Sequence, residues 1–178
     1  MGTVNPRTRL YSAYLVSTLL ALLSACEAPP EPTLDPALWQ EFRGRFVRDG
    51  RVIDSGNDRI SHSEGQGYGM LFAVAAGDRV GFDALWHWTA RVLQREDALL
   101  RWRYAPCPTA DASCVNDANN ASDGDLLVAW ALLRADAAWG GSDYLAAARR
   151  ILDAVEQQLV VTRYGYTLLL PGAKGFRH

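Results

Sequence analysis

Two short segments of the chain combine carboxylates with glycines where a helical pattern begins. Residues 61–70 (S-H-S-E-G-Q-G-Y-G-M) contain Glu64, and residues 121–130 (A-S-D-G-D-L-L-V-A-W) contain Asp123 and Asp125. Cleavage of a glycosidic bond needs one carboxyl group to protonate the leaving oxygen and, in the inverting reaction, another to activate water. Carboxylates at two helix starts, beside glycines that leave room for a ligand, therefore suggest polysaccharide hydrolysis.

A structural role for the same carboxylates is the main alternative. Ser61 with Glu64, and Ser122 with Asp125, have the spacing of a capping box, in which a hydroxyl and a carboxylate satisfy free backbone N–H groups. Each glycine in a helix costs about 1 kcal/mol relative to alanine, so a helix selected for stability alone would avoid them. Close approach of another backbone or of a substrate explains the glycines better. We interpret Asp125 as structural.

The chain resembles glycoside hydrolase family 8, the inverting enzymes that include endoglucanases associated with cellulose synthesis. The resemblance is carried by residues 121–139, around A-S-D-G-D, with Val128 where isoleucine or methionine is usual, and by the S-E-G-Q-G-Y-G-M run at 63–70. It extends from about Trp39 to the last residue. Further matching segments are D-G-R-V-I-D at 49–54 and L-L-L-P-G at 168–172.

The resemblance implies roles for individual residues. It makes Glu64 the general acid and Asp123 the carboxylate beside the cleaved sugar, where it binds hydroxyls or orients water. It also places Trp102 in the cleft as a platform for a sugar ring, and Asn120 is expected to contact sugar hydroxyls through its amide. The family's catalytic base belongs to a Tyr-Asp segment that would lie beyond residue 178, so no carboxylate of this chain is assigned that role.

Helical periodicity dominates the mature sequence and predicts an all-α fold, with helices packed on helices around a shared core. The five predicted helices cover residues 35–47, 63–76, 82–95, 122–139 and 142–159. Only the tail, 160–170, has a strand pattern, as a hairpin around Tyr164 and Gly165. The resemblance implies an (α/α)6 toroid of six inner and six outer helices, of which this chain would hold about five.

Apolar residues at helical spacing predict which faces meet the core. On the second predicted helix these residues include Tyr68 and Phe72, and on the fourth they include Trp130 and Leu133. We therefore interpret Trp130 as a packing residue rather than a sugar platform.

The N-terminal 26 residues have the pattern of an export signal. Arg7 and Arg9 supply positive charge, the apolar stretch 11–23 is shorter than the ~20 residues of a bilayer-crossing helix, and L-S-A precedes Cys26. The last feature resembles a bacterial lipobox, which predicts that Cys26 is lipidated; an ordinary cleaved signal is the alternative. Residues 27–36, with four prolines, are then a tether, and 37–178 are the N-terminal portion of the catalytic domain.

Export to an oxidising compartment predicts a disulfide between Cys107 and Cys114. A metal site is the weaker alternative, because neither a C-x-x-C pair nor a nearby histidine accompanies them. We expect no metal and no cofactor. The net charge of −2, with scattered basic residues, gives no indication of nucleic-acid binding.

The function predicted from these features is that of an exported endo-β-1,4-glucanase that cleaves cellulose-like chains with inversion. It would be periplasmic or extracellular, anchored to the membrane through Cys26, and associated with cellulose synthesis. The chain ends at residue 178 where family members continue, so we interpret it as part of a longer enzyme and expect no turnover from it alone. The alternatives are a non-catalytic, glycan-binding envelope lipoprotein, or a family enzyme acting on chitosan, xylan or mixed-linkage glucan.

Overall fold

The computed structural model describes residues 32–107, 114–115, 117–140 and 143–176. The predicted signal, Cys26 and the first half of the tether lie outside these ranges. Within them, no helix is both long and apolar enough to cross a membrane.

Helices make up most of the described chain. The helices are α2 (Pro36–Phe46), α3 (Ser63–Ala75), α4 (Arg79–Val92), α5 (Ser122–Trp139) and α6 (Tyr144–Leu159). Short antiparallel pairs of strands lie between them: β1 (Val47–Arg48) with β2 (Arg51–Val52), β3 (Ser61–His62) with β4 (Arg103–Tyr104), and β5 (Val160–Arg163) with β6 (Tyr166–Leu169). The predicted helices are therefore confirmed, with shifts of a few residues at their starts.

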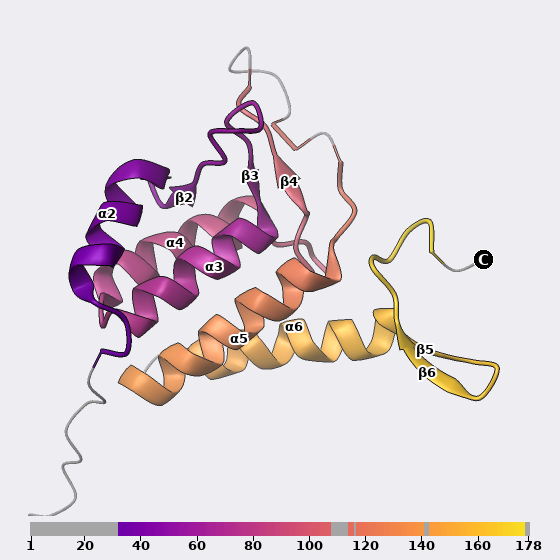
Figure 1. Ribbon diagram of the computed structural model, residues 1–178. Helices are drawn as coiled ribbons and strands as arrows, with labels where there is room; N and C mark the ends of the chain where they lie inside the picture. The colour runs from indigo at the N-terminus through magenta and orange to yellow at the C-terminus, as the bar shows by residue number, and fades with distance from the viewer. Residues whose placement is uncertain (1–31, 108–113, 116, 141–142, 177–178) are drawn as a thin grey trace, which may run out of the picture. The chain divides into compact units, whose positions relative to one another are not determined.

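The four long helices pack as two antiparallel hairpins, α3 with α4 and α5 with α6 (Figure 1). Helix α3 contacts both α4 and α5, so α3 and α5 form the central pair. Aromatic rings join the two hairpins: Phe82 of α4 meets Trp139 of α5 and Tyr144 of α6 edge to face, at centroid distances of 5.4 and 5.3 Å. The core lies among these helices and includes the fully buried Met70 of α3 and Leu132 of α5.

Glycines allow α3 and α5 to touch near their N-terminal ends. A Cβ added at Gly67 would lie 2.5 Å from Cβ of Leu127, and one added at Gly124 would overlap the Ser63 hydroxyl and lie 2.9 Å from the backbone nitrogen of Glu64. No side chain fits in either space. The interpretation that these glycines serve a close backbone approach is confirmed.

The apolar faces predicted for α3 and α5 are only partly covered in the described chain. Tyr68 is 43% exposed and Trp130 is 54% exposed, whereas the buried faces contain Gly67 and Ala73 of α3 and Ala129 of α5. Small residues form the contact because the two backbones approach closely, and this leaves the large rings outside. Side-chain size therefore does not indicate which residues of α3 and α5 meet each other.

The hairpin predicted in the tail is confirmed. Tyr164 and Gly165 form its turn with φ values of 51° and 81°, as a two-residue hairpin turn requires. The expectation that only the tail is strand-like is wrong, because β1–β2 and β3–β4 also form ladders. Each of these strands is two residues long, too short for alternation to be visible.

Candidate functional site

Glu64 lies in the first turn of α3, with its side chain 42% exposed. The cap of this helix is His62, whose ring Nδ1 accepts a hydrogen bond from the Gly65 backbone N–H at 3.0 Å. Ser61 belongs to β3 and donates its hydroxyl to the Val52 carbonyl instead. The capping-box interpretation of Ser61 and Glu64 is therefore wrong, and the Glu64 carboxylate is not used as a cap.

A buried glutamine fastens this turn to the rest of the fold. The Gln66 side-chain oxygen accepts the Val52 backbone N–H at 2.5 Å, and its amide nitrogen donates to the Thr89 hydroxyl at 2.7 Å and the Gly50 carbonyl at 3.2 Å. Gln66 thus joins α3 to the β1–β2 turn and to α4. A fully buried amide with every polar atom satisfied holds the start of α3 rigidly.

The start of α5 is built differently from the capping box that spacing predicted. Its N-terminal cap residue, Ala121, offers no side-chain hydrogen bond, and Ser122 donates its hydroxyl to the Leu170 carbonyl. Asp125 is fully buried, and its two carboxylate oxygens accept the Leu100 backbone N–H and the Asn120 amide, both at 2.7 Å. Asp125 is structural, but it ties separate segments together rather than capping its own helix.

Burial raises the pKa of Asp125 to about 6. The hydrogen bonds from Asn120 and from the Leu100 backbone favour the carboxylate and lower the pKa, but the loss of hydration outweighs them.

Asn120 is almost fully buried, at the edge of a hollow that Trp102 and Asp123 also line. It is 3% exposed; its amide nitrogen donates to Asp125, and its side-chain oxygen accepts the Ala173 backbone N–H at 2.7 Å. Both ends of the amide thus have partners within the protein, and contact with a sugar hydroxyl stays a prediction. Asn120 joins the start of α5 to the segment after β6.

Asp123, in contrast, is exposed and shares an opening with Glu64. The crossing of α3 and α5 at Gly124 brings the two helix starts together (Figure 1). Both carboxylates line a hollow of about 530 Å³ whose remaining lining is aromatic or aliphatic, including Tyr68, Leu127 and Trp130. Glu64 and Asp123, the two carboxylates predicted to act on substrate, therefore line the same accessible hollow.

The strand segment around Trp102 connects these two helix starts. The Ser63 backbone N–H donates to the Trp102 carbonyl at 3.0 Å, and the Trp102 backbone N–H donates to the Asn119 carbonyl at 2.9 Å. The side chains of Trp102, Asp123 and the exposed Phe176 line a second hollow, of about 510 Å³. Trp102 is thus next to Asp123, as a sugar platform would have to be.

The ring of Trp102 is held by a residue that the sequence analysis missed. Its indole N–H donates to Asp117 at 2.7 Å, and the Arg103 guanidinium lies 5.7 Å from its centroid. The Asn119 backbone N–H and the Trp102 indole lower the pKa of Asp117. Fifteen residues separate Asp117 from Trp102, and no local pattern in the sequence signals this pair.

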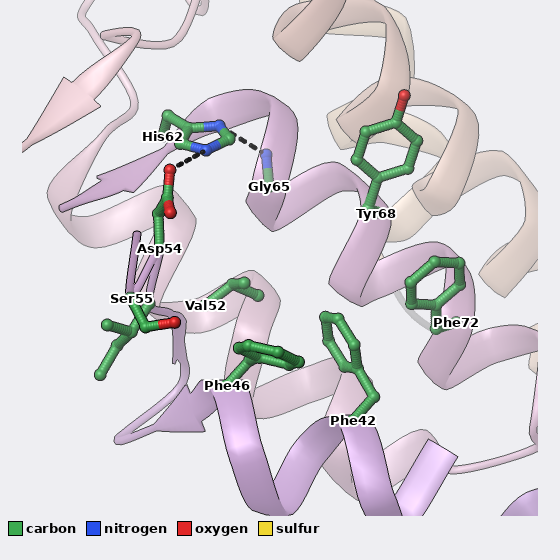
Figure 2. Close-up of a pocket in the computed structure, with 10 residues that line it drawn as sticks. Phe42, Phe46, Val52, Asp54, Ser55, His62, Gly65, Tyr68 and Phe72 are labelled. Atoms are coloured by element: carbon green, nitrogen blue, oxygen red, sulfur yellow. Dashed lines mark hydrogen bonds and ion pairs between the residues drawn. The ribbon is translucent and has the colours of Figure 1, made fainter. Parts of the chain in front are cut away.

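A third hollow, of about 400 Å³, lies on the other side of α3 (Figure 2). Its walls are mainly apolar, and its polar edge contains Asp54, Ser55 and His62. The aromatic walls come from α2 and α3: Phe42, Phe46, Tyr68 and Phe72.

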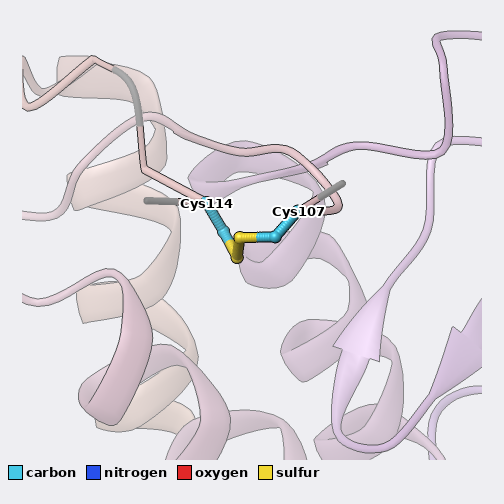
Figure 3. Close-up of a disulfide and its surroundings, with 2 residues drawn as sticks. All are labelled: Cys107 and Cys114. Atoms are coloured by element: carbon cyan, nitrogen blue, oxygen red, sulfur yellow. A yellow bond between two sulfur atoms is a disulfide. The ribbon is translucent and has the colours of Figure 1, made fainter. Parts of the chain in front are cut away.

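A disulfide joins Cys107 and Cys114, with their Cα atoms 4.9 Å apart (Figure 3). The Ala105 backbone N–H also donates to the Cys114 carbonyl, at 2.9 Å. Both bonds brace the chain that leaves β4, close to Trp102. Within the described ranges, no group of three or more His, Cys, Asp or Glu side chains is arranged to hold a metal ion.

Comparison with known proteins identifies the family. Residues 5–178 match the model of glycosyl hydrolases family 8. The chain is 46% identical to the endoglucanase of Cellulomonas uda over 143 residues, covering 78% of this chain and 38% of that protein. It is 43% identical to the probable endoglucanase of Novacetimonas hansenii over 151 residues, covering 84% of this chain and 43% of that protein.

Solved structures show the same relationship. A family 8 endo-β-1,4-glucanase from an Achatina fulica gut metagenomic library is 45% identical, with a TM-score of 0.74 over 79% of this chain and 44% of that one. The endo-β-1,4-glucanase CMCax of Acetobacter xylinum is 42% identical, with a TM-score of 0.76 over 83% of this chain and 46% of that one. The chain belongs to glycosyl hydrolases family 8, and the helical (α/α)6 fold class predicted for it is confirmed. It spans less than half the length of these relatives.

Proposed function

We propose that this chain supplies the proton-donating part of an endo-β-1,4-glucanase that cleaves cellulose-like chains with inversion. The observation that carries the proposal is the shared opening of Glu64 and Asp123 at the crossing of α3 and α5. Membership of family 8 supports hydrolysis of a glycosidic bond. The similarity to endoglucanases favours β-1,4-glucan over chitosan, xylan or mixed-linkage glucan.

The chemistry follows from what each side chain can reach. Glu64 is accessible, at a helix start that Gln66 fixes, and donates its proton to the leaving oxygen. Asp123 hydrogen-bonds hydroxyls of the sugar at the cleaved bond or orients the attacking water. Trp102, held by Asp117, stacks on the apolar face of a neighbouring sugar ring. The inverting reaction also needs a carboxylate that activates water, roughly 6.5–9.5 Å from the acid, and we assign that role to no residue described here.

Glu64→Gln tests the proposal in the full-length gene product. The amide keeps the size of the side chain but is no acid, so hydrolysis of carboxymethyl cellulose should fall by at least about 100-fold. Released reducing ends and thermal unfolding are measured together.

The control is Glu156→Gln, which changes an exposed glutamate of α6 and should retain activity. Activity of Glu64→Gln within about tenfold of wild type would remove Glu64 from the role of acid. Glycan binding without any turnover by the wild type would favour the non-catalytic alternative.

We also propose, from the sequence alone, that the protein is exported and anchored to the membrane through Cys26, where a β-glucan chain and the cellulose-synthesis machinery are its partners. Firm anchoring requires more than one acyl chain, because a single chain binds membranes only marginally. A palmitate analogue should label the wild type and leave Cys26→Ala unlabelled. Recovery of unlabelled wild-type protein in the soluble periplasmic fraction would indicate an ordinary cleaved signal instead.

A further inference from the structure

The residue that caps α3 is of an unusual type for this position. Serine, threonine, asparagine and aspartate are the common N-cap residues, yet here the Gly65 backbone N–H is bound by the imidazole of His62, at 3.0 Å from Nδ1. A short polar side chain would satisfy that N–H equally well. A ring with a second nitrogen offers a further contact, which a hydroxyl cap would not provide.

The second nitrogen of the ring faces a carboxylate. Nε2 of His62 lies 3.6 Å from Oδ2 of Asp54 (Figure 2). Because Nδ1 accepts the Gly65 hydrogen, a neutral ring must carry its own hydrogen on Nε2, pointing toward Asp54. Asp54 is itself anchored, since its Oδ1 accepts the Gly56 backbone N–H at 3.1 Å and its own N–H donates to the Ile60 carbonyl at 2.8 Å.

The same ring lies beside the candidate acid. Nδ1 of His62 is 3.9 Å from Oε2 of Glu64, and the His62 side chain is 27% exposed. We propose that Asp54 and His62 form a positioning pair. In this pair Asp54 fixes the tautomer and angle of His62, and the His62 ring, bonded to the Gly65 backbone N–H, packs beside the Glu64 side chain and limits where that side chain can lie when it delivers its proton. The proposal rests on the proposed function, because it concerns Glu64 as the acid.

Nuclear magnetic resonance tests the pair without substrate, on the ¹⁵N-labelled full chain. The wild type should show a coupling across the hydrogen bond between the Gly65 amide and Nδ1 of His62, with hydrogen on Nε2 only. Asp54→Ala should weaken this coupling and give a mixture of tautomers, whereas Asp58→Ala, in the same loop, should change neither. A hydrogen on Nδ1, or no coupling in the wild type, would overturn the proposal whatever the enzyme's activity.

Kinetics of the full-length gene product separate positioning from capping. His62→Ala should lower kcat by about 100-fold, the scale of a small misplacement of a reacting group, with KM changed by less than about threefold. His62→Asn keeps a capping acceptor, so thermal stability should return to that of the wild type while kcat stays at least about tenfold low. His87→Asn, an exposed histidine of α4, is the control and should leave both unchanged.

The outcomes distinguish the two proposals. Full recovery of kcat in His62→Asn would show that the ring is only a cap, and would overturn the positioning role. An active Glu64→Gln enzyme would instead refute the proposed function, while the tautomer measurement would still decide whether Asp54 orients His62.

Discussion

At the scale of single residues, the two aspartates at the start of α5 have opposite environments. Asp123 is exposed in the opening that also holds Glu64, whereas Asp125 is fully buried and bound by Asn120 and the Leu100 backbone. The residues differ in sequence position by only two, which on a helix places them on different faces. The same short motif thus supplies one exposed carboxylate and one buried carboxylate that holds the fold together.

The raised pKa of Asp125 predicts how stability depends on pH. In the folded state the Asp125 carboxyl keeps its proton up to about pH 6, whereas in the unfolded state it has the ordinary aspartate pKa of 3.8. Between these values the folded state binds more protons, so the free energy of unfolding should fall as pH rises from about 4 to above 6, by up to roughly 3 kcal/mol.

Urea unfolding of the wild type and of Asp125→Asn across this pH range checks the prediction. The variant lacks the titrating group, so its stability should change less over the same interval. Asp153→Asn, at an exposed site on α6, should follow the wild type. Parallel pH profiles for the wild type and Asp125→Asn would contradict the assignment of the raised pKa.

At the scale of elements, the glycines at the crossing of α3 and α5 make the site possible. They let the backbone that follows Asp123 rest against the one that leads into Glu64, and this contact brings both carboxylates to one opening. Side chains of ordinary size at these positions would separate the two helix starts. The placement of Glu64 and Asp123 in one opening is therefore a consequence of helix packing, and it should be sensitive to a single added methyl group.

Gly124→Ala tests this dependence against a matched control. Its Cβ would overlap the Ser63 hydroxyl, so we expect a loss of roughly 1–3 kcal/mol in unfolding free energy together with a loss of activity. Gly44→Ala, on α2, has no atom within 4 Å of the added Cβ and should gain roughly 0.5–1 kcal/mol. Equal changes in the two variants, measured by urea unfolding, would contradict a close contact at Gly124.

The sequence predicts the helices well and their contacts poorly, for a physical reason. Helix starts at Ser63 and Ser122 follow from local pattern, and so do the positions of Glu64 and Asp123 on them. Which face is buried depends on how closely two helices approach, and here Gly67 rather than Tyr68 meets the partner helix. The true cap, His62, makes a local contact with Gly65, but histidine is not among the common N-cap residues. The partner of Asp125, the Leu100 backbone N–H, is set by a tertiary contact that no local spacing reveals.

Across the whole molecule, the described helical hairpins place two carboxylates and several exposed aromatic rings along one side of the α3–α5 pair. Glu64, Asp123 and the exposed rings of Tyr68 and Trp130 line one hollow, and Trp102 lines the adjoining one. Carboxylates flanked by accessible aromatic rings suit a ligand with hydroxyl groups and flat apolar faces, as a β-glucan chain has. This arrangement agrees with the family assignment.

The central claim, that Glu64 donates the proton in an inverting endo-β-1,4-glucanase, has a direct measurement. Proton NMR follows the anomeric signals while the full-length gene product, wild type or Glu64→Gln, acts on cellohexaose. Inversion at a β-linkage predicts that new reducing ends of the wild type appear first as the α anomer, and that Glu64→Gln releases almost none. First appearance of the β anomer, or equal release by the variant, would contradict the account.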